Sequence, residues 1–304
     1  MSKIIVGVDQ SEGSNDAIAL ASSLAGVTGA ELMLVNVFPY DTRPSRALNA
    51  EFEAYLRKDS HELLERLRGD LEGAVEIKAI PNPSAAHGLH GLAEQEDAAL
   101  IVVGSSHTSR AGRVLPGSTA ERLLHGSPCP VAVAPKGYTR RAGAELGMIG
   151  CGFDGSQSAQ RALQAAEQIA TATGARLRVI RAFQALSFDY PPKGVPMGGV
   201  NYNDKLQQRA AEELKAAVAK LEGGVRAEPF FAAGNAAEIL AEASEQLDLL
   251  LLGSRGYGPL HSVLVGGVAG RVVREAACPV IVLPRMARHV ADDSLFAEAV
   301  SMHG

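Results

Sequence analysis

Residues 99–104 read Ala-Leu-Ile-Val-Val-Gly, an apolar run that ends on a glycine. Residues 249–253 read Leu-Leu-Leu-Leu-Gly, so the pattern recurs with its glycine 149 residues further along the chain. A helix-like stretch follows in each copy, and each copy closes on Cys-Pro-Val, at residues 129–131 and 278–280. Solenoid repeats have periods of about 20–50 residues, so a repeat of this length is a duplicated domain.

The composition is that of a two-domain globular protein. The 304 residues are 46% hydrophobic and 21% charged, which excludes wholesale disorder. The net charge of −5 gives no global attraction for nucleic acid or for an anionic membrane, so we expect neither as a partner.

The first residues lead directly into an apolar run at 4–8, so we expect no signal peptide. No apolar run is long enough to span a bilayer. Cys129, Cys151 and Cys278 lie in or beside predicted strands, which is typical of small core residues rather than of a disulfide framework. We therefore expect a cytoplasmic protein.

Strands alternate with helices in both halves. Strands are expected at residues 4–8, 31–37, 75–80, 99–103 and 131–134, and again at 148–153, 176–182, 225–231, 249–252 and 280–283. Helices are expected at 15–25, 50–68, 84–96 and 119–124, and again at 158–171, 204–221, 236–245 and 268–276, with Ser14 capping the first. Such alternation implies parallel strands with helices on both faces. We predict an α/β fold of two tandem five-stranded domains, over residues 1–137 and 147–285, and a C-terminal tail over 286–304.

Ligands of open doubly wound sheets bind at the carboxyl ends of the strands, where the winding reverses. The loop after the fourth strand of each half lies at that edge and contains spaced glycines. Consecutive backbone N–H groups and the N-terminus of the following helix make such a loop suitable for an anion. In the first half the helix begins near Gly117, Ser118 and Thr119, and Arg110 and Arg113 would add positive charge. The alternative is that the glycines only permit tight turns.

An aspartate ends the first strand of each half, at Asp9 and Asp154. A carboxylate at this edge can accept hydrogen bonds from a ribose or hold a metal ion beside phosphates. The alternative is that each aspartate caps the helix that follows.

Together these residues resemble the universal stress protein family in its tandem two-domain form. The ATP-binding pattern of that family is Gly, two residues, Gly, nine residues, Gly, then Ser or Thr. The first copy has Gly104, His107, Gly117 and Ser118 at these positions, and the second has Gly253, Gly256, Gly266 and Gly267. The resemblance covers residues 1–135 and 147–284.

The resemblance implies Rossmann-like domains, of the adenine nucleotide α-hydrolase-like type, that bind ATP, with or without Mg²⁺. Adenine would lie at the end of the second strand, ribose near the first-strand aspartate, and phosphates on the glycine loop. The implied nucleotide-binding residues are Asp9, Val37, Gly104, His107, Gly117, Ser118 and Thr119 in the first half, and Asp154, Ala182, Gly253, Gly256, Gly266 and Gly267 in the second.

Each copy departs from the family pattern once. His107 carries a Cβ where the pattern has glycine, and Gly267 lacks the hydroxyl of the usual Ser or Thr. A lost hydrogen bond costs about 1 kcal/mol, whereas a blocked loop can abolish binding. On this argument the second copy is the slightly stronger candidate, and the two sites are not equivalent.

Two motifs of other nucleotide-binding proteins are absent from the sequence. The run from Gly150 to Ser156 has the glycine spacing of a Walker P-loop but no Lys, and no GxGxxG fingerprint follows the first strand. We favour a nucleotide-binding module of the stress response over an enzyme. A weak ATPase of the same fold, and a scaffold with degenerate sites, remain open.

The fifth strands, 131–134 and 280–283, are expected to be apolar edge strands. Exposed edge strands tend to pair with another strand. The resemblance implies pairing through this strand, which in a tandem chain joins the two halves. A protein partner is a further expectation.

Overall fold

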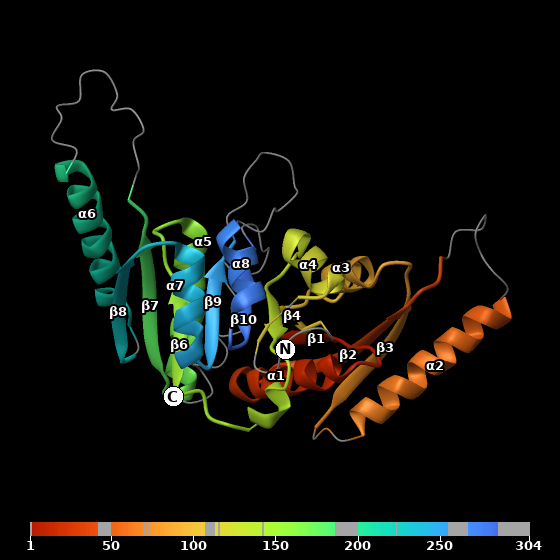
Figure 1. Ribbon diagram of the computed structural model, residues 1–304. Helices are drawn as coiled ribbons and strands as arrows, with labels where there is room; N and C mark the ends of the chain where they lie inside the picture. Colours follow the sequence, from red (N-terminus) through yellow and green to blue (C-terminus); the bar gives the residue numbers. More distant parts are fainter. Residues whose placement is uncertain are drawn as a thin grey trace, which may run out of the picture.

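The computed structural model describes residues 2–41, 50–69, 71, 73–106, 113–114, 116–141, 143–185, 200–222, 224–254 and 267–284. Ten strands of these residues form a single sheet in the order β3-β2-β1-β4-β5-β10-β9-β6-β7-β8 (Figure 1). The strands are β1 Lys3–Gly7, β2 Glu31–Phe38, β3 Val75–Pro81, β4 Leu100–Gly104, β5 Val131–Ala134, β6 Met148–Gly152, β7 Arg176–Phe183, β8 Ala227–Ala233, β9 Leu249–Gly253 and β10 Val280–Leu283. Every pair of neighbours within one half is parallel.

Helices cover both faces of the sheet. They are α1 Glu12–Thr28, α2 Ala50–Arg68, α3 Ala85–Gln95, α4 Ser118–Gly126, α5 Gln157–Thr173, α6 Val200–Ala219, α7 Ala236–Ala243 and α8 Gly267–Glu275, with short 3₁₀ turns η1 Tyr138–Arg141 and η2 Ser244–Gln246. One apolar core lies between the sheet and α1, α2, α5 and α6, and a second lies between the sheet and α3, α4, α7 and α8. Both cores run through the two halves without a break.

The apolar run of β4 shows why the central strands need no polar face. Leu100 and Val102 face the first core, whereas Ile101 and Val103 face the second, because successive side chains of a strand point to opposite sides. All four are buried. A strand covered by helices on both faces is therefore apolar throughout, as expected for a parallel sheet.

The predicted fold class is confirmed, and each predicted strand and helix is present among the described residues. Some ends differ. α1 begins at Glu12, with Ser11 as its N-cap residue, so the prediction that Ser14 caps this helix is wrong. Ser14 lies inside the first turn and is buried, and its hydroxyl bonds to Asp9 instead. α6 begins four residues earlier than predicted, at Val200. The predicted tail lies outside the described residues.

The two halves meet where β5 and β10 pair in antiparallel fashion, with Val133 opposite Val280. β5 and β10 are therefore in the middle of the sheet, and β3 and β8 are its edges (Figure 1). Because the strands are parallel within each half and antiparallel at the junction, their carboxyl ends point to opposite edges of the sheet. The carboxyl edge of the first half consequently adjoins the amino edge of the second.

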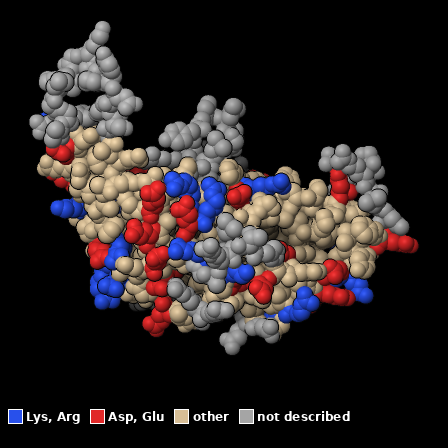
Figure 2. Space-filling view, in the orientation of Figure 1, with Lys and Arg blue, Asp and Glu red and all other residues tan. Residues whose placement is uncertain are grey.

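On the face of the molecule seen in Figure 2, basic and acidic side chains are interspersed and form no large patch of one sign. Within the part of the chain that is described, no helix combines the length and the apolar character needed to cross a membrane.

Candidate functional site

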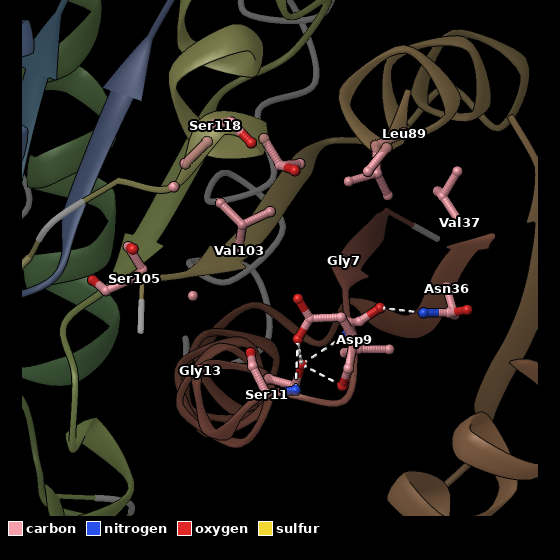
Figure 3. A pocket seen from close by; sticks show the side chains of 18 of the residues that line it. Gly7, Asp9, Ser11, Gly13, Asn36, Val37, Leu89, Val103, Ser105 and Ser118 are labelled. Carbon is pink, nitrogen blue, oxygen red and sulfur yellow. Dashed lines mark hydrogen bonds between the residues drawn. The ribbon is translucent and has the colours of Figure 1, made fainter. Parts of the chain in front are cut away.

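A cavity of about 290 Å³ opens at the carboxyl edge of the first half. The ends of β1, β2 and β4 form its floor, and the first turns of α1, α3 and α4 form its walls. Figure 3 shows that the kind of side chain changes from one end of the cavity to the other. The apolar side chains of Val37 and Leu89 lie at one end, the hydroxyls of Ser105 and Ser118 lie at the other, and Asp9 lies between them.

Asp9 is oriented by the turn that leads into α1. Its Oδ1 accepts hydrogen bonds from the amide of Ser11 at 2.8 Å and from the hydroxyl of Ser14 at 3.0 Å (Figure 3). The Ser14 hydroxyl also accepts from the Asp9 amide at 2.7 Å. The bond from the Ser11 amide forms an Asx turn before the helix, and the N-cap residue of α1 is Ser11, so Asp9 does not cap α1. The same bonds fix an exposed carboxylate at the mouth of the cavity.

Asn36 joins the ends of two strands beneath the cavity. Its side-chain amide donates to the carbonyl of Val8 at 2.7 Å, and its carbonyl oxygen accepts from the hydroxyl of Ser60 at 2.7 Å. This side chain therefore ties β1 to β2 and to α2, and it holds the floor of the cavity in place. The sequence pattern does not indicate Asn36 as a residue of the cavity and indicates Ser14 only as a helix cap, because a lone Asn in a strand and a Ser in a helix carry no motif.

The N-terminus of α4 faces the cavity without a side-chain cap. Its N-cap residue is Gly117, and the first helical hydrogen bond runs from the Glu121 amide to the Gly117 carbonyl. The N–H groups of residues 118–120 therefore have no acceptor within the helix. In α3, α5 and α7 the side chains of Ser84, Ser156 and Asn235 accept such bonds, whereas α1 resembles α4 in having no side-chain cap bond. The amides of α4, the hydroxyls of Ser118 and Thr119 and the helix dipole together make this end suitable for an anion.

The two glycines of the first loop have different reasons to be glycine. A Cβ on Gly104 would lie 2.1 Å from the carbonyl oxygen of Gly13, so the packing of α1 against β4 requires glycine there. Gly117 has an extended backbone, with φ −73° and ψ 173°, and a Cβ would meet nothing within 4 Å. No contact among the described residues therefore requires glycine at this position, and glycine is acceptable as an N-cap residue.

A second cavity, of about 310 Å³, lies at the carboxyl edge of the second half. Asp154 lies two residues after β6, as Asp9 does after β1, and its Oδ1 accepts from the Ser156 amide at 2.9 Å. The wall formed by α8 is different, because Gly267 and Val268 stand where the first cavity has Ser118 and Thr119. Val268 is 43% exposed. Among the described residues, the second cavity therefore has fewer hydroxyl groups than the first.

The structure describes ten of the thirteen residues predicted to bind nucleotide, and all ten line the two cavities. Asp9, Val37, Gly104, Gly117, Ser118 and Thr119 line the first, and Asp154, Ala182, Gly253 and Gly267 line the second. His107, Gly256 and Gly266 lie outside the described residues. A cavity therefore lies at the carboxyl edge of each half, where the sequence predicted a site, and nucleotide binding there stays a prediction.

Arg113 does not serve the first cavity as we expected. Its guanidinium is directed to the second half, where it donates to the carbonyl of Glu275 at 2.9 Å and pairs with Glu245 at 2.6 Å. The contact crosses the junction between the halves, which sequence spacing within one repeat cannot reveal.

The three cysteines are buried, as predicted. Burial raises the pKa of the Cys129 thiol to about 12 and also raises the pKa of Cys151, so both remain thiols at neutral pH. No group of three or more acidic, His or Cys side chains suited to a metal ion occurs among the described residues.

The fold and the two cavities define a tandem α/β protein with one cavity at the switch point of each half. The chain belongs to the universal stress protein family, whose family model matches residues 1–135 and 147–284.

Universal stress protein Rv2319c of Mycobacterium tuberculosis is 27% identical over 296 residues, covering 92% of this chain and 99% of that protein. A universal stress protein of Thermus aquaticus is 34% identical over 135 residues, which cover 43% of this chain and 93% of that protein. The crystal structure of a universal stress protein from Archaeoglobus fulgidus superposes with a TM-score of 0.69 at 20% identity, over 93% of this chain and 98% of that one. The architecture of two halves in one chain is thus shared with full-length relatives.

Proposed function

We propose that this chain is an ATP-binding regulatory module of the stress response, with its principal nucleotide site in the first cavity. The sequence alone favours the second copy, but the described wall of the first cavity has the hydroxyls of Ser118 and Thr119 where the second has Gly267 and Val268. The observation that carries the proposal is the order of the lining. An apolar end at Val37 and Leu89, a fixed carboxylate at Asp9 and a hydroxyl-rich, uncapped helix N-terminus at Ser118 follow one another, as adenine, ribose and phosphates do in ATP.

Each part of the lining has a role that its chemistry supports. The apolar side chains would bury the adenine ring. The Asp9 carboxylate, held by Ser11 and Ser14, would accept hydrogen bonds from the ribose hydroxyls. The amides of residues 118–120 and the hydroxyls of Ser118 and Thr119 would hold the phosphates, and the open space at Gly117 would let them approach the backbone.

A magnesium ion fits this arrangement if it is bound mainly by the phosphates. Mg²⁺ in nucleotide sites keeps several water ligands and takes one or two carboxylates beside the phosphates. Asp9 is the one carboxylate among the described residues of the lining. Asp9 would therefore be the protein ligand, directly or through water.

We favour binding over hydrolysis. The described residues at the hydroxyl end, 104–106 and 117–120, include no carboxylate or imidazole that would serve as a general base for water. Tight binding without turnover would let the nucleotide act as a signal that changes the surface available to a protein partner.

Native mass spectrometry and calorimetry with ATP test the proposal. We expect ATP to bind to the purified chain and to release no ADP over hours. Thr119→Val, which copies the Val268 of the second half, should weaken binding about fivefold through the loss of one hydroxyl bond. Repeated turnover would show that the protein is an ATPase, and the absence of any adenine nucleotide would leave a scaffold with degenerate sites.

A further inference from the structure

The second half of the chain holds the segment that leads into the phosphate end of the first cavity. Residues 113–114 belong to the glycine loop of the first half, three residues before Gly117. The Val114 amide donates to the carbonyl of Ala276 at 2.8 Å, and the Arg113 guanidinium donates to the carbonyl of Glu275 at 2.9 Å. Both acceptors lie at the C-terminal end of α8, in the other half.

Side chains reinforce this contact. Arg113 pairs with Glu245 of η2 at 2.6 Å, and the Val114 side chain is fully buried in the core that both halves share. A further ion pair joins Arg274, in the last turn of α8, to Glu121, in the first turn of α4, at 3.5 Å. The C-terminal end of α8 therefore contacts both the loop before Gly117 and the first turn of the helix after it.

The topology explains why these segments meet. The carboxyl edge of the first half adjoins the amino edge of the second, because β5 and β10 are antiparallel. The glycine loop leaves the first of these edges, and α8 ends at the second. The Arg113 guanidinium, bonded to the carbonyl of the last helical residue, is in a favourable position near the negative end of the α8 dipole.

We propose that the C-terminal end of α8 positions the phosphate end of the first cavity, with Arg113 and Val114 as the positioning residues. The first nucleotide site then depends on the second half of the chain, although none of the described residues of that half lines the first cavity. This inference rests on the proposed function in one respect, namely that the anion at the α4 N-terminus is the phosphate chain of a nucleotide. The loop is anchored by bonds that do not involve the ligand.

A positioning role and a direct phosphate-binding role of Arg113 predict opposite effects of removing the Glu245 charge on ATP affinity. If Arg113 were a phosphate ligand held back by Glu245, removal of the Glu245 charge would release it and strengthen ATP binding. If Arg113 positions the loop, the same change loosens the anchor and weakens ATP binding. Adenosine, which lacks phosphates, should bind equally well to the altered and unaltered proteins, since its binding uses the Val37 and Asp9 end.

The test uses the full chain and follows hydrogen exchange of peptides spanning residues 113–124 during titration with MgATP or with adenosine. Arg113→Gln should raise the Kd for ATP at the first cavity about three- to tenfold, and Glu245→Gln about two- to threefold, as exposed ion pairs and single hydrogen bonds suggest. Neither should change the Kd for adenosine by as much as twofold. Arg209→Gln is the control, because Arg209 lies on α6 and pairs with Glu213 there, outside the anchor that α8 and η2 form.

Without nucleotide, exchange of the Val114 amide should be faster in Arg113→Gln than in the wild type, and equal rates would overturn the inference. Unchanged ATP affinity in Arg113→Gln, tighter binding in Glu245→Gln, or equal losses for ATP and adenosine would also overturn it. If ATP does not slow hydrogen exchange in the wild-type chain, the proposed function is refuted instead. The comparison of Val114 exchange without nucleotide does not depend on ATP binding and still tests the anchor.

Discussion

Gly104 lies against Gly13 so closely that a Cβ on Gly104 would be 2.1 Å from the Gly13 carbonyl oxygen. The second half repeats the contact, since a Cβ on Gly253 would lie 2.4 Å from the carbonyl carbon of Ser158. In both halves the helix after the first strand crosses the end of the fourth strand at this point. The first glycine of each loop is therefore required by packing, whether or not a ligand is bound.

Gly104→Ala should consequently destabilise the fold. The Cβ would force backbone atoms apart, and overpacking of this kind costs about 1–3 kcal/mol in the free energy of unfolding. Denaturant unfolding followed by circular dichroism measures the change. Gly126→Ala is the control, because a Cβ there meets nothing within 4 Å and should leave the stability nearly unchanged. Equal stability of Gly104→Ala and wild type would contradict the packing argument.

Gly117→Ala, in contrast, should weaken ATP binding and leave the stability of the fold nearly unchanged. Its backbone is extended and its surroundings are open, so the free energy of unfolding should change by less than about 1 kcal/mol, the usual range for an N-cap substitution. ATP affinity should fall at least about tenfold if a phosphate occupies the space that the Cβ takes. Calorimetry and unfolding of the same preparation separate the two effects. Unchanged affinity would show that phosphate does not approach this residue.

Val268→Thr should strengthen nucleotide binding in the second cavity. Val268 stands where the first cavity has Thr119, and threonine is nearly isosteric with valine. One added hydroxyl bond to phosphate is worth about 1 kcal/mol, or about fivefold in Kd. Ligand protection of α8 in hydrogen exchange reports on this cavity separately from the first. An unaffected or weaker response would mean that the phosphates of a bound nucleotide do not reach α8.

The repeat and its alternation of strands and helices were sufficient to predict the fold. Each half needs apolar central strands, and the topology then brings the aspartate after the first strand and the glycine loop to one edge. Asp9 and Gly117 follow from that rule. The rule is insensitive to small errors at the ends of elements, such as the early start of α6.

Contacts that depend on two distant segments could not be predicted from the pattern. Gly104 looked like a phosphate-loop glycine, yet its neighbour Gly13 lies in another element. Arg113 looked like a source of charge for the site, yet its partners Glu245 and Glu275 belong to the other half. Spacing within one repeat carries no information about such pairs.

Glu96 should make the stability of the first half depend on acidic pH. Its carboxylate bonds to Lys3 at 2.7 Å and to Lys78 at 2.8 Å, and these bonds lower its pKa from 4.5 to about 2. A lowered pKa in the folded state adds stability above pH 4.5, which is lost as the pH falls from 4.5 to about 2. Glu96→Gln should therefore cost about 1–2 kcal/mol at neutral pH and almost nothing near pH 2.

Unfolding of the two proteins between pH 7 and pH 2 measures this difference. Glu76→Gln is a suitable control, because Glu76 is 53% exposed and its contact with Lys3 is longer, at 3.4 Å. Its effect on the free energy of unfolding should be small at every pH. If the loss of unfolding free energy in Glu96→Gln stayed constant with pH, ionisation of Glu96 would not be the cause of that loss.

The antiparallel pairing of β5 with β10 should hold the two halves together in solution. Val131 lies opposite Val282 in this register, and both side chains are buried. Val131→Lys or Val282→Glu alone would bury an unpaired charge, which costs several kcal/mol, so each should separate the halves and enlarge the radius of gyration in small-angle scattering. The double variant places opposite charges across the pair and should restore part of the compact shape. Single variants with the scattering curve of the wild type, or a double variant no more compact than the singles, would show that this strand pair does not join the halves.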